Sequence, residues 1–385
     1  MQEIRVGVIG IGNMGMSHSK KIFEGEVDGM RLTAVADRNP ALREKAKEAF
    51  GDAVAIFAEG DELLNYENLD AVIVAVPHYD HPYFVMEAIK HDLHVVSEKP
   101  AGVYTKAVRE MNEFASKHNK VFAMMFNQRT NCVYRKMKEM VDNGEIGEIK
   151  RVNWIITDWY RTQYYYDSGD WRATWSGEGG GVLLNQCPHN LDLLQWICGM
   201  PVSVRAFCHE GKWHDVEVED DVTAYLEYAN GATGVFITTT GDAPGTNRFE
   251  ITGTKGTLIC DSKTLKFLKL NVDEREYCKT ATEGFKKPSA EQWIEVETDG
   301  KHEKHMGVLR AFTNHILKGE PLVAEGYEGI NGLTLSNAMH LSSWTDSKIT
   351  LPIDEDLFYE ELKKRIAGSR KKVANSVILD VEGTY

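Results

Sequence analysis

Three glycines near the N-terminus have the spacing G-x-G-x-x-G, between a predicted buried strand over residues 4–10 and a predicted helix from about residue 14. In a dinucleotide-binding turn, such glycines bend the chain, let a pyrophosphate approach the backbone and allow close helix packing. The helix N-terminus then offers unpaired N–H groups to the phosphates. The alternative is a tight turn without a ligand. We predict a phosphate-binding loop made of Gly10, Ile11, Gly12, Asn13, Met14 and Gly15.

A carboxylate, Asp37, follows the second predicted strand, about 20 residues beyond the glycines. An acid at this position binds the adenosine ribose hydroxyls and repels a 2′-phosphate, which favours NAD over NADP. Arg38 is adjacent and could accept that phosphate, so NADP stays possible. We therefore expect a nicotinamide cofactor, with NAD preferred, and no metal.

Apolar runs rich in Val, Ile and Ala alternate with amphipathic helical patterns through the first third of the chain. This alternation predicts an α/β fold, with a doubly wound Rossmann domain over residues 1–127. From residue 152 onward, long alternating segments with turn signals at ANGA and GTKG predict an α+β domain with a large, mainly antiparallel open sheet, interrupted by one strong helix at 187–199. We assign residues 128–352 to this substrate-binding and oligomerisation domain, and 353–385 to a C-terminal helix and tail.

The composition favours a small-molecule ligand. The chain has 385 residues and a formal net charge of −14, which argues against nucleic acid and against an anionic membrane as partners. Six scattered cysteines indicate reduced thiols, and neither a signal peptide nor an apolar stretch of about 20 residues is visible, so we expect a cytoplasmic protein. An open sheet is often an oligomer interface, so a homodimer or homotetramer through the C-terminal sheet is expected.

Two further motifs follow predicted strands: Val76-Pro77-His78 with His81, and Glu98-Lys99-Pro100. With the glycine loop they resemble the Gfo/Idh/MocA oxidoreductases, the group that contains glucose–fructose oxidoreductase and inositol dehydrogenases. The resemblance implies that Lys99 lies beside the nicotinamide and the reacting hydroxyl, where its ammonium would stabilise a developing alkoxide. A solvated lysine before a turn is the alternative. The resemblance also implies a cofactor cleft lined by Val76, Pro77, His78, His81, Glu98, Lys99 and Asn127.

The segment GEGGGVLLNQCPHNLDLLQWICG resembles another signature of this family, and His189 occupies its histidine position. The spacing of four between Asn185 and His189 predicts that both side chains share one helical face. A neutral imidazole can accept the hydroxyl proton as hydride leaves the same carbon, whereas the alternative is a buried core histidine. Asn185 stands where many members have Asp, and His78 where many have Asn. Because an amide cannot take a proton, we expect His189 to do so, with Lys99 assisting.

Several other polar residues have two interpretations. Asp192 could orient His189 or form a structural salt bridge. Arg129 is interpreted as one member of an ion pair at the domain interface. His302 and His305 have the spacing H-x-x-H in a highly charged segment without a third ligand, so we interpret them as a solvated surface.

The segment YYYDSGDWRATW contains aromatic residues that could pack on sugar C–H surfaces and an arginine that could hold hydroxyls. Its alternative is a loop whose aromatics complete a core. The predicted substrate-binding residues are Lys99, Tyr165, Trp171, Arg172, Asn185 and His189. The favoured function is hydride transfer between nicotinamide and a secondary hydroxyl of a sugar, glycoside or cyclitol. The alternatives are a non-catalytic nucleotide or ligand sensor, and a redox-neutral NAD-dependent glycoside-processing enzyme.

Overall fold

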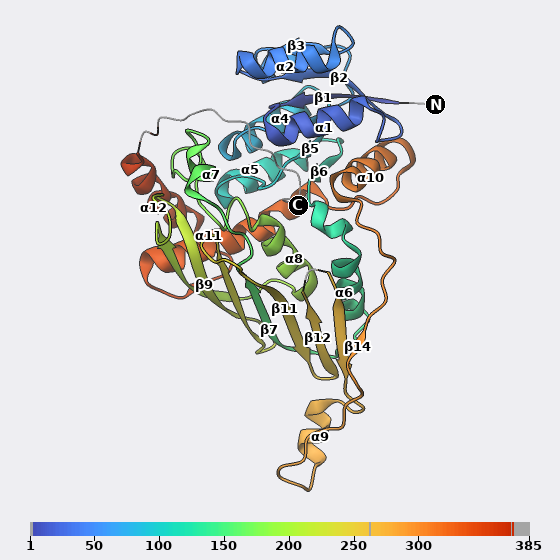
Figure 1. Cartoon of the computed structure of the whole chain (residues 1–385), viewed down its shortest axis with the longest axis vertical. Helices are drawn as coiled ribbons and strands as arrows, with labels where there is room; N and C mark the ends of the chain where they lie inside the picture. Colours follow the sequence, from blue (N-terminus) through green and yellow to red (C-terminus); the bar gives the residue numbers. More distant parts are fainter. Residues whose placement is uncertain (1–2, 262, 371, 373–385) are drawn as a thin grey trace.

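In a computed structural model that describes residues 3–261, 263–370 and 372, the chain forms two sheets, one above the other in Figure 1. The first has six parallel strands in the order β3-β2-β1-β4-β5-β6, which is the Rossmann order and confirms the predicted doubly wound sheet. Its strands are β1 (Ile4–Ile9), β2 (Met30–Ala36), β3 (Ala55–Phe57), β4 (Ala71–Val74), β5 (His94–Ser97) and β6 (Phe122–Met124).

Helices cover both faces of this sheet, so its strands are almost continuously apolar. Val8 in β1 and Ile73 in β4 are fully buried, as this arrangement requires. Because the strands are parallel, their carboxyl ends bring the glycine loop, the turn after β4 and the Glu98–Lys99 turn to one edge. The helices of this domain are α1 (Asn13–Phe23), α2 (Pro40–Phe50), α3 (Gly60–Leu64), α4 (His81–Lys90) and α5 (Thr105–Ala115).

The second sheet has nine strands in the order β14-β13-β12-β11-β7-β10-β9-β8-β15. Strands β7 and β10 are parallel and the other neighbours are antiparallel, which confirms a mainly antiparallel sheet. Its strands are β7 (Ile149–Ile156), β8 (Ser203–Glu210), β9 (Glu219–Glu227), β10 (Thr233–Thr239), β11 (Asn247–Gly253), β12 (Gly256–Cys260), β13 (Leu265–Lys269), β14 (Ile294–Glu295) and β15 (Ile349–Thr350).

The expectation of a single strong helix in this half is wrong. Besides α8 (Pro188–Cys198), the structure has the long helices α10 (Lys304–Lys318) and α11 (Gly329–Thr345). Helix α11 lacks a simple apolar stripe because it is covered on several sides, so its polar residues are buried together with its leucines; Asn337, for example, bonds both Thr105 N and the Val103 carbonyl. The remaining helices and turns are α6 (Cys132–Asp142), α7 (Gln163–Asp167), α9 (Glu274–Thr280), α12 (Glu355–Gly368), η1 (His78–Asp80), η2 (Asn127–Thr130) and η3 (Gly326–Glu328).

Helix α10 packs on the Rossmann sheet although it comes late in the sequence. Leu309 and Phe312 belong to the same buried cluster as Ile73 and Val96. Figure 1 shows α10 beside β6, whereas α9 projects from the far end of the second sheet. This docking brings the first turn of α10 close to α1.

Helix α12 forms the C-terminal end of the described structure, and the predicted tail at 371 and 373–385 lies outside the described residues. Among the residues that the structure describes, no helix is long and apolar enough to cross a bilayer.

Candidate active site

The glycine loop after β1 has the geometry of a phosphate cradle. Gly10 has φ of +85°, and a Cβ there would lie 2.6 Å from the Ala75 carbonyl oxygen. A Cβ on Gly15 would lie 1.9 Å from the Gly10 oxygen, so both positions require glycine. Gly12 faces open space and is the N-cap of α1, with no side chain capping the helix. The loop therefore leaves backbone N–H groups for an anion, which fits a dinucleotide pyrophosphate.

Asp37 lies beside this loop at the carboxyl end of β2. Its carboxylate accepts hydrogen bonds from Ile11 N at 2.9 Å and from Asn39 N at 2.8 Å. The Arg38 guanidinium turns to Glu59, with Nε 2.7 Å from a carboxylate oxygen. The Asp37 carboxylate is therefore fixed beside the glycine loop, and Arg38 already has an anionic partner.

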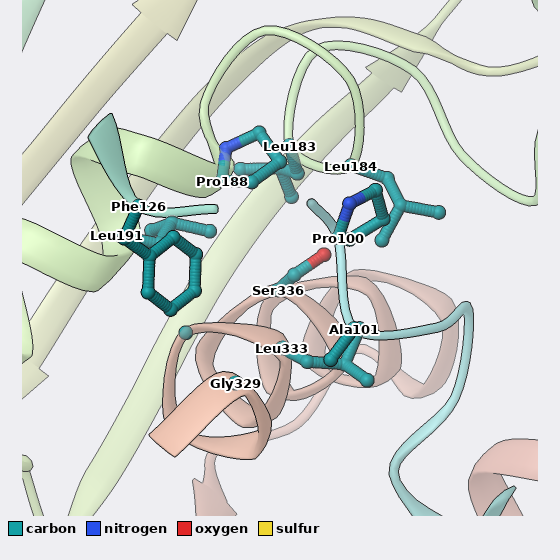
Figure 2. Close-up of a pocket in the computed structure, with 11 residues that line it drawn as sticks. Pro100, Ala101, Phe126, Leu183, Leu184, Pro188, Leu191, Gly329, Leu333 and Ser336 are labelled. Carbon is teal, nitrogen blue, oxygen red and sulfur yellow. The ribbon is translucent and has the colours of Figure 1, made fainter. Parts of the chain in front are cut away.

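Lys99 is held at the boundary of the two domains. Its Nζ donates a hydrogen bond to the main-chain oxygen of Asn185 at 2.9 Å. The turn that carries it packs in a small apolar pocket, where Pro100 and Ala101 meet Leu184 and Leu333 (Figure 2). Lys99 is therefore not the solvated surface lysine of the alternative interpretation.

His189 is buried in the first turn of α8, and the Phe126 ring packs edge-on at 6.2 Å between centroids. Burial, with smaller contributions from the positive charges of Lys99 and His305, lowers the pKa of His189 well below its ordinary 6.5. A neutral imidazole in this position can accept a proton.

Asn185 does not share a helical face with His189, because α8 begins only at Pro188 and Asn185 lies in the preceding turn. Its Nδ2 donates a hydrogen bond to Glu178 Oε1. The other carboxylate oxygen of Glu178 accepts from Ala173 N at 2.6 Å. Burial raises the pKa of Glu178 overall, because it outweighs the Arg172 charge and these hydrogen bonds, which lower it. Sequence reasoning missed Glu178, and its only signal was a single acid within a run of glycines.

A second buried carboxylate, Glu219 in β9, anchors the glycine segment ahead of Asn185. It accepts hydrogen bonds from Gly181 N at 2.9 Å and Leu183 N at 3.0 Å, and His340 Nε2 lies 2.9 Å from it. The turn that presents Asn185 is therefore tied to the sheet. Sequence reasoning also missed this residue, because it stands in an otherwise ordinary strand pattern.

The predicted substrate-binding residues of the 164–175 loop lie together. The Arg172 guanidinium stacks 4.7 Å from the Tyr165 ring centroid and 4.5 Å from that of Trp171, and it donates to Tyr165 Oη at 3.0 Å. Trp171 contacts His78 edge-on at 5.7 Å, and Gln186 Nε2 donates to Tyr165 Oη at 3.2 Å. The loop therefore spans from the turn after β4 to the segment that follows Asn185.

The turn after β4 is held by two histidines. His78 Nδ1 lies 3.1 Å from the Glu178 carbonyl oxygen, and burial, with the charges of His81 and Lys99, lowers the pKa of His78 well below 6.5. His81 lies 2.6 Å from the Pro100 oxygen and 2.8 Å from the Val76 oxygen. These contacts link the Val76–His78 turn to the Lys99 turn and to the second domain.

The interpretation of His305 as solvated is wrong. Its ring centroid lies 5.2 Å from that of His18 in α1, and Asn127 Nδ2 is 3.5 Å from its Nδ1. Burial lowers the pKa of His305 to about 4, although the Glu98 carboxylate opposes this shift. The charged residues around His305 predict exposure, because its burial depends on the docking of α10 on the Rossmann domain and not on the local sequence. His302, in the same segment, is partly buried and pairs with Asn131 in an isolated β-bridge.

Glu98 lies next to the histidine pair formed by His18 and His305. His18 Nε2 lies 2.7 Å from its carboxylate, and Lys99 N donates to it at 3.1 Å. Burial alone raises the pKa of Glu98, but His18 and the charges of His305 and Lys99 lower it to about 2. An anionic group therefore lies directly behind Lys99.

Arg129 and Asp192 form a bidentate ion pair, with N–O distances of 2.8 and 2.6 Å and both side chains almost fully buried. Arg129 also contacts Glu328 at 2.7 Å. Arg129 therefore forms an ion pair as predicted, but all three residues belong to the 128–352 domain, so the pair does not join the two predicted domains. Of the two interpretations of Asp192, the structure shows the salt bridge.

Comparisons with known proteins agree with this architecture. Residues 4–126 match the model described as oxidoreductase family, NAD-binding Rossmann fold, and residues 134–259 match the GFO/IDH/MocA C-terminal domain. The chain is 28% identical to myo-inositol 2-dehydrogenase of Thermotoga maritima, over 87% of this chain and 95% of the relative. It is 26% identical to D-glucoside 3-dehydrogenase of Escherichia coli, over 90% and 97%.

Among solved structures, the WlbA dehydrogenase of Bordetella pertussis, in complex with NADH and UDP-GlcNAcA, has a TM-score of 0.77 and 26% identity, over 92% of this chain and 100% of the other. The two family models match the two domains in order, and each match to a relative covers nearly the full length of both chains. The chain therefore belongs to the Gfo/Idh/MocA family of oxidoreductases.

Proposed function

We propose that the protein is an NAD-dependent dehydrogenase that oxidises a secondary hydroxyl of a sugar, glycoside or cyclitol, or reduces the matching ketone. The observation that carries the proposal is the convergence of Lys99, Asn185 and a neutral, buried His189 at the carboxyl edge of the Rossmann sheet. A proton donor and a proton acceptor at one site match the demands of alcohol oxidation.

The cofactor would be held by the first domain. The glycine loop fits the pyrophosphate, and Asp37 would bind the ribose hydroxyls. NAD is proposed over NADP because a 2′-phosphate would meet the Asp37 charge, while Arg38 is paired with Glu59. When bound, nicotinamide supplies a hydride acceptor at the edge where Lys99 lies.

The proton of the substrate hydroxyl would pass to this chain's own residues. His189 is neutral and would accept it, and the Lys99 ammonium would donate a hydrogen bond to the same oxygen as its negative charge develops. Asn185 would orient the hydroxyl, since its amide cannot take the proton. Trp171 and Tyr165 would pack on the C–H face of the ring, with Arg172 between them.

These residues support the proposed substrate class, as do relatives named as dehydrogenases of myo-inositol, levoglucosan and D-glucosides. The test is turnover of the purified protein with NAD or NADP and a panel of cyclitols, anhydrosugars and glycosides, followed by the absorbance of reduced nicotinamide. We expect turnover with at least one compound, and a loss of about 100-fold or more in kcat in both Lys99→Ala and His189→Ala.

Each alternative predicts a different result in the same assay. Nucleotide binding without turnover of any compound would identify a sensor. A cleaved glycoside without net reduced nicotinamide would identify the redox-neutral enzyme. Undiminished kcat in either variant would refute the assigned roles.

We also propose a homodimer or homotetramer through the open face of the second sheet. Phe207 in β8 pairs with Thr223, and Tyr225 in β9 pairs with Arg205, so the two aromatic residues are diagonal neighbours on one face of the sheet. They are 53% and 41% exposed. Large apolar side chains on an exposed sheet face favour a partner surface. Light scattering should give a mass of two or four chains, and Phe207→Glu with Tyr225→Lys should lower it.

A further inference from the structure

We propose that Glu178 is a positioning residue for Asn185: its buried carboxylate holds the amide with Nδ2 inward, so that Oδ1 is the atom presented to the substrate hydroxyl. The role of that oxygen rests on the proposed function. The pairing itself rests on contacts within the described structure, and it can be tested without turnover.

The two side chains form a closed, directional pair. Glu178 is 1% exposed and Asn185 is 8% exposed, so water does not compete freely for either group. Glu178 Oε1 accepts from Asn185 Nδ2, and Oε2 accepts from Ala173 N at 2.6 Å. The nitrogen and oxygen of an amide point in opposite directions, so a donor fixed on Glu178 turns Oδ1 away from it.

A flipped amide would be excluded by this carboxylate. Rotation by half a turn would place Oδ1 against Oε1, which brings two acceptors together in a buried position without a proton between them. The orientation of Asn185 is therefore set by Glu178 and not by the substrate. The amide oxygen then acts as an acceptor, while Lys99, which bonds the main-chain oxygen of Asn185, is the nearby donor.

The charged and titratable groups around Glu178 come from three elements. Arg172 approaches from the 164–175 loop, Tyr166 from α7, and Glu219 from β9. His78 bonds the main-chain oxygen of Glu178 and not its carboxylate. Burial and the Glu219 charge raise the pKa of Glu178, and Arg172 is the cation whose charge opposes this shift and favours the ionised carboxylate that the pair needs.

The proposed pair can be tested by exchanging the carboxylate and the amide between positions 178 and 185. Glu178→Gln removes the fixed acceptor and permits the flip, so we expect kcat to fall about 10-fold or more with nucleotide affinity unchanged. Asn185→Asp places two carboxylates in contact, and one of them must hold a proton. We expect this variant to lose activity and melting temperature as pH rises. The double variant, Glu178→Gln with Asn185→Asp, reverses the hydrogen bond, because the amide introduced at position 178 becomes the donor. Its kcat should return to within a few-fold of the wild-type value, and its pH profile should match that of the wild type.

Glu217→Gln is the matched control. Glu217 also anchors this loop, by accepting from Trp175 N at 2.7 Å, but its recorded hydrogen bonds go to Trp175, Ser369 and Arg370 and none goes to Asn185. We expect it to retain wild-type kcat, which separates loop anchoring from amide orientation. The four proteins of the exchange would be compared in kcat, pH profile and melting temperature.

Recovery in the double variant beyond the sum of the single effects supports the pair. A Glu178→Gln variant with wild-type kcat, or a double variant no better than the sum, overturns it. If the wild-type protein turns over no compound, the proposed function fails, while the same cycle in melting temperature still tests the pair.

Discussion

Lys99 Nζ donates a hydrogen bond to the main-chain oxygen of Asn185 at 2.9 Å, across a sequence separation of 86 residues. The donor follows a strand of the Rossmann sheet, and the acceptor precedes a helix of the second domain. The contact joins the expected cofactor edge to the turn that carries the Asn185 amide.

The first prediction concerns the pH dependence of kcat on the acid side of its profile. Because burial, followed by Lys99 and His305, lowers the pKa of His189 well below 6.5, the imidazole stays neutral as pH falls through 6.5. We expect kcat for alcohol oxidation to stay constant from about pH 8 to 6.5. The measurement is a pH profile of kcat at saturating substrate. An acid limb centred at 6.5 or above that disappears in His189→Gln would contradict this assignment.

The second prediction concerns cofactor choice. Asp37→Ser removes the charge that would repel a 2′-phosphate, so the ratio of NADP to NAD affinity should rise by about 10-fold to 100-fold. Fluorescence titration with both nucleotides measures this ratio. Asp52→Ser, at an exposed carboxylate paired with Lys47, is the control and should leave the ratio unchanged. An unchanged ratio in Asp37→Ser would show that this carboxylate does not face the ribose.

The third prediction concerns the buried ion pair of Arg129 and Asp192. Asp192→Ala leaves the Arg129 charge buried with only Glu328, so it should lower the free energy of unfolding by about 3 to 5 kcal/mol. Asp299→Ala breaks a solvent-exposed pair with Arg135 and should lower the free energy of unfolding much less. Urea denaturation measures both. Equal costs would mean that the Arg129 pair is as solvated as the surface pair.

The fourth prediction concerns stability in mild acid. His305 has a folded pKa of about 4 against an ordinary 6.5, so the unfolded chain binds a proton before the folded chain does as pH falls. Stability is therefore lost between pH 6.5 and about 4, by up to about 3 kcal/mol from this group. His78, His81 and His189 also have lowered pKa values and add losses of the same sign.

The contribution of His305 is isolated by substitution. In His305→Gln the free energy of unfolding should decline less steeply with acid than in the wild type, while the exposed control His118→Gln should follow the wild type. Urea denaturation at several pH values gives the slopes. Parallel slopes for His305→Gln and the wild type would place His305 in solvent.

Local patterns were sufficient for the first domain. The glycine spacing, the acid after β2 and the Lys99 turn all lie at the carboxyl ends of strands whose alternation with helices is visible in the sequence. A parallel sheet then brings these ends together whatever the rest of the chain does. The strand patterns and turns of the second sheet were equally readable, because one face of an antiparallel sheet alternates with the other.

What the sequence determined by itself is thus the pair of sheets, the glycine loop between β1 and α1, and the presence of Lys99 and His189 as candidates. The tertiary structure alone decided that Asn185 lies before α8 and bonds Glu178, that His305 meets Asn127 across 178 residues, and that the polar residues of α11 are buried. The physical reason is that periodicity reports which face of one element is apolar, whereas these contacts depend on which distant element covers it. Burial by a distant partner leaves no local pattern to read.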